Sequence, residues 1–257
     1  MRTIAPGHGL PHWVGTMTAH GATPPRLDSM RTWIRRSLWE VVPRDQRDTD
    51  DAFRRRQMVA AVVVLVGAGV LGWSLRLEPG GGLFYAAAVL LALIWTCGAF
   101  VSGRLHLGRI SRREDLIRPV VEPILIGLAL VALFVLGSLV VREIPPLADY
   151  VSSVLEYADE GSLPVLALIT FFNGIAEELF FRGAMYAAIP RHPVFWTTLA
   201  YVVATLATGN VMLAFAAILL GAVCGLQRRA SGGVLAPILT HITWSLSMLF
   251  LLPLLFR

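Results

Sequence analysis

The chain is built from long apolar runs that short, Arg-rich segments separate. A helix needs about 20 apolar residues to cross the hydrocarbon of a bilayer. Seven runs approach or reach that length: residues 58–75, 83–101, 120–141, 163–189, 194–208, 211–226 and 234–256. An acidic, mildly amphipathic stretch at 147–159 would add an interfacial helix. The pattern predicts an all-α fold, a polytopic membrane helix bundle of about seven to eight transmembrane helices.

Composition supports a membrane protein. Hydrophobic residues make up 56% of the 257 residues and charged residues only 15%, whereas soluble domains carry about 25% charged residues. So little charge cannot cover a soluble globule, which excludes an ordinary cytosolic enzyme. The net charge of +5 is carried by Arg alone, with no Lys. Because these Arg residues flank apolar runs, we expect the lipid bilayer and no nucleic acid as a partner.

The Arg residues also predict an orientation. Short cytoplasmic loops carry an excess of Lys and Arg. If the N-terminus is cytoplasmic, only Arg76, Arg142 and Arg257 fall outside. The loop residues that then fall inside are Arg44, Arg47, Arg54, Arg55, Arg56, Arg104, Arg109, Arg112, Arg113, Arg118, Arg191, Arg228 and Arg229. The use of Arg without any Lys is typical of a GC-rich genome, so we expect a multi-pass protein of the bacterial inner (plasma) membrane.

Four segments follow from this pattern. Residues 1–28 are rich in Gly, Pro, Thr and His, which predicts a disordered N-terminal tail. Residues 29–57 form an Arg-rich, amphipathic cytoplasmic segment that either lies on an anionic leaflet or packs on the membrane domain. Residues 58–141 are predicted to hold three N-terminal transmembrane helices. Residues 142–257 hold the core helices that carry the polar groups.

One charged cluster lies inside a span. The sequence NGIAEELFFRG places Glu177, Glu178 and Arg182 within the apolar run 163–189, and Glu177 lies roughly 18 Å from the cytoplasmic end of that run. Intramembrane ionisable groups are expensive and mark functional sites by default. Glu178 and Arg182 are spaced i, i+4 and can pair on one helix face. Glu177 has no such cation near it in the sequence, and a carboxylate without a dedicated cation suits a general base that acts on water. The alternative interpretation is that the cluster is a purely structural clamp between helices.

Other polar residues lie at similar depths. His241 lies roughly 12 Å from the cytoplasmic end of the last span, with Ser245 one turn further, and Asn210 lies roughly 21 Å deep. The depths of these groups and of the Glu pair allow them to line one cavity. A lone intramembrane His is also often a satisfied hydrogen-bonding residue. Gly221 and Gly225 form a small-residue face for close helix packing.

These residues resemble the motifs of a known family. Glu177–Gly183, preceded by Gly174, is similar to the E-E-x-x-x-R motif, and the stretch from His241 to Ser245 is similar to a terminal H-x-x-x-N motif. Both are motifs of the CAAX protease and bacteriocin-processing (CPBP, or Abi) family of intramembrane endopeptidases. The resemblance covers residues from about 163 to 250, and it assigns Gly174 and Gly183 to packing around the motif.

The resemblance implies an activity. The family's fold is an α-helical membrane peptidase with a polar site recessed from the cytoplasmic side. It implies an endopeptidase that hydrolyses a peptide bond in membrane-associated proteins or peptides. Glu177 would activate water, Glu178 and Arg182 would support the site, and His241 would complete it.

Two departures from the family pattern bear on the mechanism. The middle motif, F-x-x-x-H, aligns with residues 206–210, so that Asn210 replaces its His, and Ser245 replaces the last Asn. If zinc is used, the remaining ligands are Glu177, Glu178 and His241, and zinc prefers His, Cys or carboxylate over a carboxamide. We therefore favour a metal-free site with no assigned cofactor. In such a site Asn210 and Ser245 would be donors that orient substrate or the oxyanion.

Two other function classes stay open at this point. The motif substitutions are compatible with a catalytically inactive membrane scaffold or escort protein that retains the CPBP fold. The buried Glu pair is compatible with a proton-coupled transporter. The chain shows no internal repeat of the kind that many transporters contain.

Overall fold

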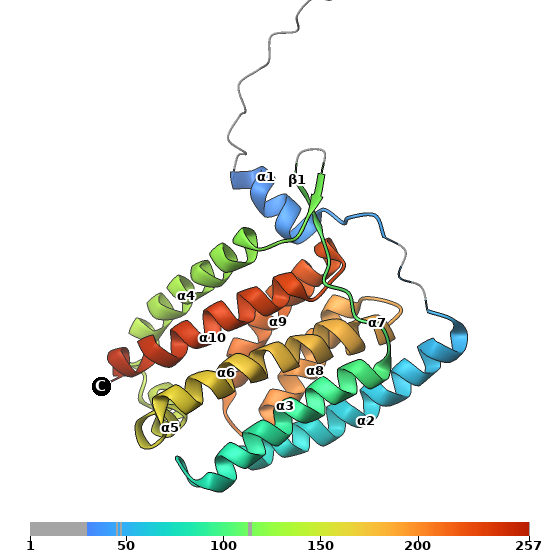
Figure 1. Cartoon of the computed structure of the whole chain (residues 1–257). Coiled ribbons are helices and arrows are strands. Elements are labelled where there is room, and N and C mark those ends of the chain that lie inside the picture. Colours follow the sequence, from blue (N-terminus) through green and yellow to red (C-terminus); the bar gives the residue numbers. More distant parts are fainter. Residues whose placement is uncertain (1–29, 45, 47, 113–114, 257) are drawn as a thin grey trace, which may run out of the picture.

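The computed structural model describes residues 30–256 apart from residues 45, 47, 113 and 114, and it is a bundle of long helices (Figure 1). The predicted tail, residues 1–28, lies outside the described residues. The first three long helices are α2 (Asp50–Ser74), α3 (Gly82–Ser102) and α4 (Val121–Val141). Helix α2 begins eight residues before the predicted span because Thr49 caps it, accepting a hydrogen bond from the backbone N–H of Ala52 at 3.4 Å.

The second half of the chain supplies the other helices. Helix α5 (Pro145–Glu160) leads into α6 (Leu163–Glu178). Helix α6 continues without a break through a π-helical segment, η2 (Leu179–Met185), into the short α7 (Tyr186–Ala188). The bundle is completed by α8 (Pro193–Leu206), α9 (Val211–Ser231) and α10 (Leu235–Phe256).

Six helices are long and apolar enough to cross a membrane within the described part of the chain. They are α2, α3, α4, the α6–α7 unit (Leu163–Ala188), α9 and α10. Helix α8, predicted as a span at 194–208, has only 14 residues and rises about 21 Å, against a hydrocarbon thickness of about 30 Å. Helix α5 is amphipathic and has no buried residue, as an interfacial helix would. The structure therefore supports a multi-pass membrane protein with six clear candidate spans.

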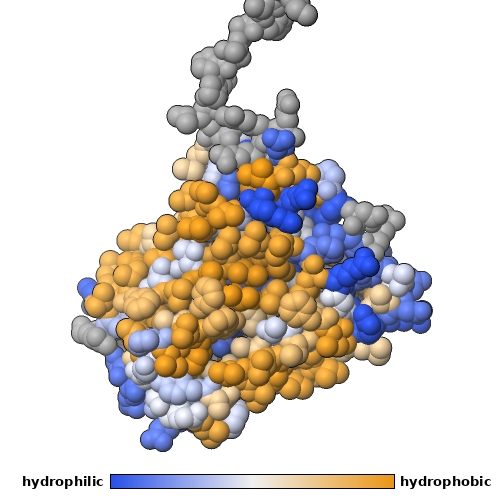
Figure 2. All heavy atoms as spheres, viewed as in Figure 1, coloured by the Kyte–Doolittle hydropathy of each residue, from blue (hydrophilic) through white to orange (hydrophobic). Residues whose placement is uncertain are grey.

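The outer surface agrees with this reading. Figure 2 shows a broad apolar surface over α3, α4, α6 and α10, and hydrophilic residues gather toward the two ends of the bundle. Many exposed side chains of these helices are large and apolar, such as Leu90, Leu136 and Leu168. Exposed apolar surface of this extent is expected to face lipid.

The Arg-rich segment before α2 packs on the membrane helices. It contains α1 (Met30–Ile34) and a π-helical turn, η1 (Arg35–Trp39), which contacts α9. The backbone N–H of Val42 donates to the carbonyl of Ala230 at 3.1 Å, and Arg44 donates to the carbonyl of Arg229 at 2.9 Å. In the described part of this segment, η1 and the residues that follow it therefore pack on the end of α9.

The bundle is all-helical, as predicted, and one short β-hairpin lies in a connection outside it. The connection between α3 and α4 contains a two-stranded antiparallel hairpin of β1 (Ile110–Arg112) and β2 (Asp115–Ile117). The same connection crosses the start of α10, where the N–H of Val234 donates to the carbonyl of His106 at 2.8 Å. Three-residue strands in a polar loop give no periodic signal that a sequence pattern could detect.

Candidate active site

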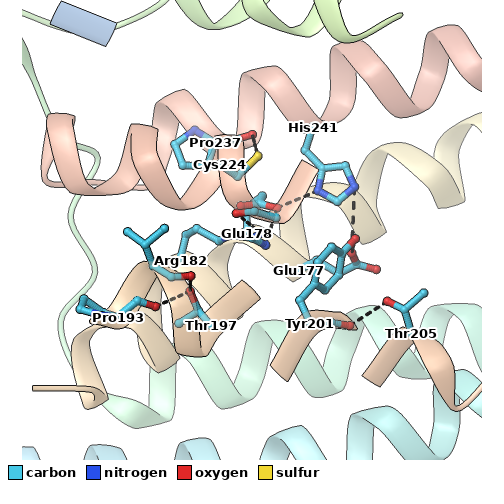
Figure 3. Close-up of polar contacts among 12 residues, drawn as sticks. Glu177, Glu178, Arg182, Pro193, Thr197, Tyr201, Thr205, Cys224, Pro237 and His241 are labelled. Atoms are coloured by element: carbon cyan, nitrogen blue, oxygen red, sulfur yellow. Dashed lines mark hydrogen bonds and ion pairs between the residues drawn. The ribbon is translucent and has the colours of Figure 1, made fainter. Parts of the chain in front are cut away.

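The charged cluster predicted in α6 is buried where α6, α8, α9 and α10 meet. Glu178 and Arg182 form the predicted pair, with 3.0 Å between Nη1 and Oε1, and both side chains have no exposed surface. The same Oε1 atom lies 2.8 Å from Nδ1 of His241, which comes from α10. Figure 3 shows the His241 ring with one nitrogen toward each of the two carboxylates. The cluster therefore joins α6 and α10 through Glu178 and His241, which lie 63 residues apart in sequence.

Arg182 fixes this cluster to a third and a fourth helix. Its Nη2 donates to the backbone carbonyl of Gly221 in α9 at 3.1 Å. Its guanidinium carbon lies 4.9 Å from the centre of the Tyr201 ring in α8, within the range of a cation–π contact. The backbone carbonyl of Arg182 also accepts a hydrogen bond from Nε of Arg228 at 2.7 Å. Arg182 begins the last turn of a π-helical segment, and such segments occur frequently at functional sites.

Glu177 occupies a different environment from its neighbour. Its side chain is 15% exposed, whereas that of Glu178 is fully buried. The hydroxyl of Tyr201 donates to Oε2 of Glu177 at 2.7 Å, and Nε2 of His241 lies 4.0 Å from the same oxygen. Within the described chain, no hydrogen bond is recorded to the other oxygen, Oε1. Glu177 thus has one oxygen held by the protein and one available to a water or substrate.

The glycines assigned to packing lie at the helix contacts that bring these side chains together. A Cβ at Gly174 would lie 3.6 Å from Cδ2 of His241, and a Cβ at Gly221 would lie 3.3 Å from Nη2 of Arg182. A Cβ at Gly225 would lie 3.0 Å from Val194 in α8. At Gly183 it would lie 2.9 Å from Leu105. Small residues at these positions let the helix backbones approach closely.

Asn210 does not join the cluster. Its Oδ1 accepts hydrogen bonds from the N–H groups of Met212 and Leu213, both at 3.0 Å, as the N-cap of α9. Its Nδ2 donates to the carbonyl of Tyr150 at 2.6 Å and to Oγ of Ser153 at 3.3 Å, both in α5. Because these contacts already engage both ends of the amide, the predicted oxyanion role finds no free donor on Asn210 in this conformation.

Ser245 is placed differently. It lies one turn beyond His241 on α10, and its Oγ is buried without a hydrogen-bond partner among the described residues. The adjacent Trp244 has an Nε1 in the same state. Both residues line an apolar cavity of about 490 Å³ between α4, α5, α6, α9 and α10, which Asn210 also lines. Two buried, unpartnered donors therefore lie between this cavity and the turn of α10 that carries His241.

The described residues do not assemble a zinc site. No group of three or more His, Cys, Asp or Glu side chains lies close enough to hold a metal in the described part of the chain. Of the predicted ligands, Glu178 is already bonded to Arg182 and to Nδ1 of His241. That leaves Glu177 and Nε2 of His241, whereas catalytic zinc takes three protein ligands.

Sequence reasoning missed Tyr201 and Arg228. Tyr201 lies in an apolar run, where an aromatic residue is expected to serve packing, so that nothing in the sequence marks it as a polar contact of Glu177. Arg228 was assigned only to the cytoplasmic charge, yet it is 5% exposed and bonds to the backbone of the cluster. Its position near the end of α9, about two turns beyond Gly221, was the available signal.

The fold and the site define a helical, multi-pass membrane protein with a buried Glu–Glu–Arg–His cluster. Residues 159–247 match the model of the family described as Type II CAAX prenyl endopeptidase Rce1-like. That segment is an Rce1-like domain of the CPBP family, a family of proteases, and it contains the whole cluster. Comparisons of the chain with curated proteins and with solved structures found no match.

Proposed function

We propose that this protein is an intramembrane endopeptidase that hydrolyses a peptide bond in membrane-associated proteins or peptides. One observation carries the proposal: Glu177, the less buried of two adjacent carboxylates, lies 4.0 Å from a His241 whose other nitrogen is bonded to the Glu178–Arg182 pair. A base, a positioned imidazole and an orienting carboxylate are the parts that acyl-transfer chemistry requires. The family assignment of residues 159–247 supports the same reaction class.

In this mechanism Glu177 is the general base. Its free oxygen accepts a proton from water, whose oxygen attacks the scissile carbonyl carbon and forms a new C–O bond. The proton then passes from Glu177 to the leaving nitrogen as the C–N bond breaks, giving a carboxylic acid and an amine. Tyr201 and His241 approach the other oxygen, Oε2, and leave this one open.

The remaining groups stabilise the charge that develops on the carbonyl oxygen. The Glu178 carboxylate, 2.8 Å from Nδ1, orients the His241 ring so that Nε2 faces the reacting groups. Ser245 supplies a hydroxyl donor from the same face of α10, since its Oγ has no partner among the described residues. Donors fixed in this way stabilise an oxyanion most effectively in a site with little water.

The cavity of about 490 Å³ gives the substrate's apolar side chains a place beside the site. Its walls come from the candidate spans α4, α6, α9 and α10 and from the interfacial helix α5, so that a substrate would approach from the bilayer or from its interface. The excess of Arg at one end supports a cytoplasmic N-terminus. Together with the use of Arg without any Lys, this Arg excess supports a location in the bacterial inner membrane.

The test compares protein N-termini, and released peptides, in membranes of cells that contain wild type or Glu177→Gln at equal abundance. We expect a set of new N-termini in the wild type that the Glu177→Gln cells lack. Glu156→Gln is the matched control, because Glu156 is an exposed carboxylate on α5, outside the cluster. Its N-terminal profile should equal that of the wild type.

Identical profiles for wild type and Glu177→Gln, with both proteins inserted at the same level, would contradict the proposal. That outcome would favour the inactive scaffold, because a scaffold needs the fold and not the base. Loss of the same fragments in Glu156→Gln would also contradict the assignment, since a general charge effect would then explain the result.

A further inference from the structure

We propose that Tyr201 is a positioning residue that holds the carboxylate of Glu177 for reaction; this inference rests on the proposed function. Its hydroxyl donates to Oε2 of Glu177 at 2.7 Å, a short distance that is typical of a hydrogen bond to a charged acceptor. Tyr201 comes from α8, whereas Glu177 comes from α6, so that the bond joins two helices.

The position of the Tyr201 ring is itself fixed. Its centre lies 4.9 Å from the guanidinium carbon of Arg182 and 5.0 Å from the Phe181 ring. The residue is 8% exposed. Since Arg182 also holds Glu178, a single guanidinium sets the place of Glu178 directly and of Glu177 through Tyr201. Tyr201 therefore links the two carboxylates through Arg182.

Tyr201 differs from the polar residues that flank it on the same face of α8, because its hydroxyl bonds to a residue of α6. Thr197 and Thr205 lie one turn before and one turn after it, and both are buried. Their hydroxyls bond within α8, to the carbonyls of Pro193 and Tyr201, each at 2.8 Å. The Tyr201 hydroxyl, in contrast, crosses to the carboxylate of another helix.

This contact also explains how the site holds Glu177 although Asn210 stands where the family motif has His. The amide of Asn210 is engaged with α5 and with the start of α9. The hydrogen bond that fixes Glu177 comes instead from Tyr201, nine residues earlier in the chain. We infer that α8 contributes to this site through its middle, by Tyr201, and not through the loop that follows it.

The variant Tyr201→Phe removes the hydroxyl and keeps the ring under Arg182. Losing a hydrogen bond to a charged group lowers the turnover rate by roughly ten- to hundredfold. A positioning residue acts through Glu177, so kcat should fall while KM stays the same. Both are measured on the full chain in liposomes, with a peptide that spans a Glu177-dependent cleavage site.

Tyr186→Phe is the matched control. Tyr186 is also 8% exposed, and its ring lies 4.9 Å from the guanidinium carbon of Arg228, yet the structure records no contact between it and Glu177. Its variant should retain wild-type kcat and KM. A Tyr201→Leu variant, which also loses the ring, should be less stable to heat than Tyr201→Phe, and it separates the role of the ring from that of the hydroxyl.

An infrared measurement tests the contact without any substrate. The difference spectrum between wild type and Glu177→Gln isolates the carboxyl bands of Glu177. Tyr201→Phe should shift these bands, and Tyr186→Phe should leave them in place. Unshifted bands in Tyr201→Phe would overturn the inference whether or not the protein is a peptidase.

The kinetic outcomes distinguish the two proposals. If Glu177→Gln is inactive and Tyr201→Phe has the wild-type kcat, the inference about Tyr201 is wrong and the proposed function stands. If Glu177→Gln cleaves as fast as the wild type, the proposed function is wrong. If Glu177→Gln is inactive and Tyr201→Phe has a lower kcat with an unchanged KM, the result supports both proposals.

Discussion

The Glu178–Arg182 pair makes a quantitative prediction about the stability of the bundle. Both side chains are fully buried, and they lie 3.0 Å apart. Removing one partner of such a pair leaves an uncompensated buried charge and costs about 3–5 kcal/mol. Arg182→Gln also loses the bond to the Gly221 carbonyl and the contact with the Tyr201 ring. We therefore expect Arg182→Gln to destabilise the protein by an amount in the upper part of that range.

A double-mutant cycle tests the origin of this effect. In Glu178→Gln/Arg182→Gln neither buried side chain is charged, so the double variant should be less destabilised than the sum of the singles by about 2–3 kcal/mol. The control cycle uses the exposed pair Arg142–Glu143, 3.1 Å apart, with 46% and 71% of the side chains exposed. Its coupling should stay below about 1 kcal/mol.

The assay is equilibrium unfolding in mixed micelles, in which the fraction of SDS is raised and tryptophan fluorescence reports the folded population. Additive losses for Glu178→Gln and Arg182→Gln would refute the reasoning, because they would show that the two charges do not compensate each other. A loss below about 1 kcal/mol for Arg182→Gln would refute it as well, since it would place the pair in the class of solvated surface bridges.

Two further predictions follow from residues outside the charged cluster. Asn210→Ala should lower the unfolding temperature and expose α5 to proteolysis, because it removes an N-cap worth about 0.5–2 kcal/mol and the bonds to α5; Asn210→Asp should retain the cap and still release α5, and an unchanged digestion rate in both would contradict this. Burial and the nearby Arg228, Arg56 and Arg104 lower the pKa of His106 below its usual value of 6.5. The unfolded chain therefore binds a proton at His106 more readily than the folded chain does. As a result, the free energy of unfolding decreases as the pH falls below about 6.5. His106→Gln should reduce the drop in unfolding temperature between pH 8 and pH 5, and an equal drop in both proteins would argue against the assignment.

Much of the architecture could be predicted from local sequence patterns. The length of apolar runs located the helices that became α2, α3 and α4, because burial in lipid imposes a minimum helix length. The i, i+4 spacing of Glu178 and Arg182 predicted their pair, because it depends on the geometry of one helix. The E-E-x-x-x-R motif and His241 identified the family segment, which the match over residues 159–247 supports.

The parts that could not be predicted depend on contacts between helices. The bond from Tyr201 to Glu177 requires a particular rotation of α8 against α6, and an apolar run does not specify that rotation. Asn210 was found by motif alignment, yet its hydrogen bonds depend on where α5 packs. Helix α8 was predicted as a span from its hydropathy, and its 14 residues became apparent only from the structure.

The central claim is that Glu177 activates water to hydrolyse a peptide bond. The most direct measurement incubates the purified protein in liposomes with a peptide that spans a Glu177-dependent site, in water enriched in oxygen-18. Mass spectrometry of the product should find one atom of oxygen-18 in the new C-terminal carboxyl group with wild type, and no product with Glu177→Gln. A product formed at the same rate by Glu177→Gln, or one that carries no oxygen from water, would contradict the account.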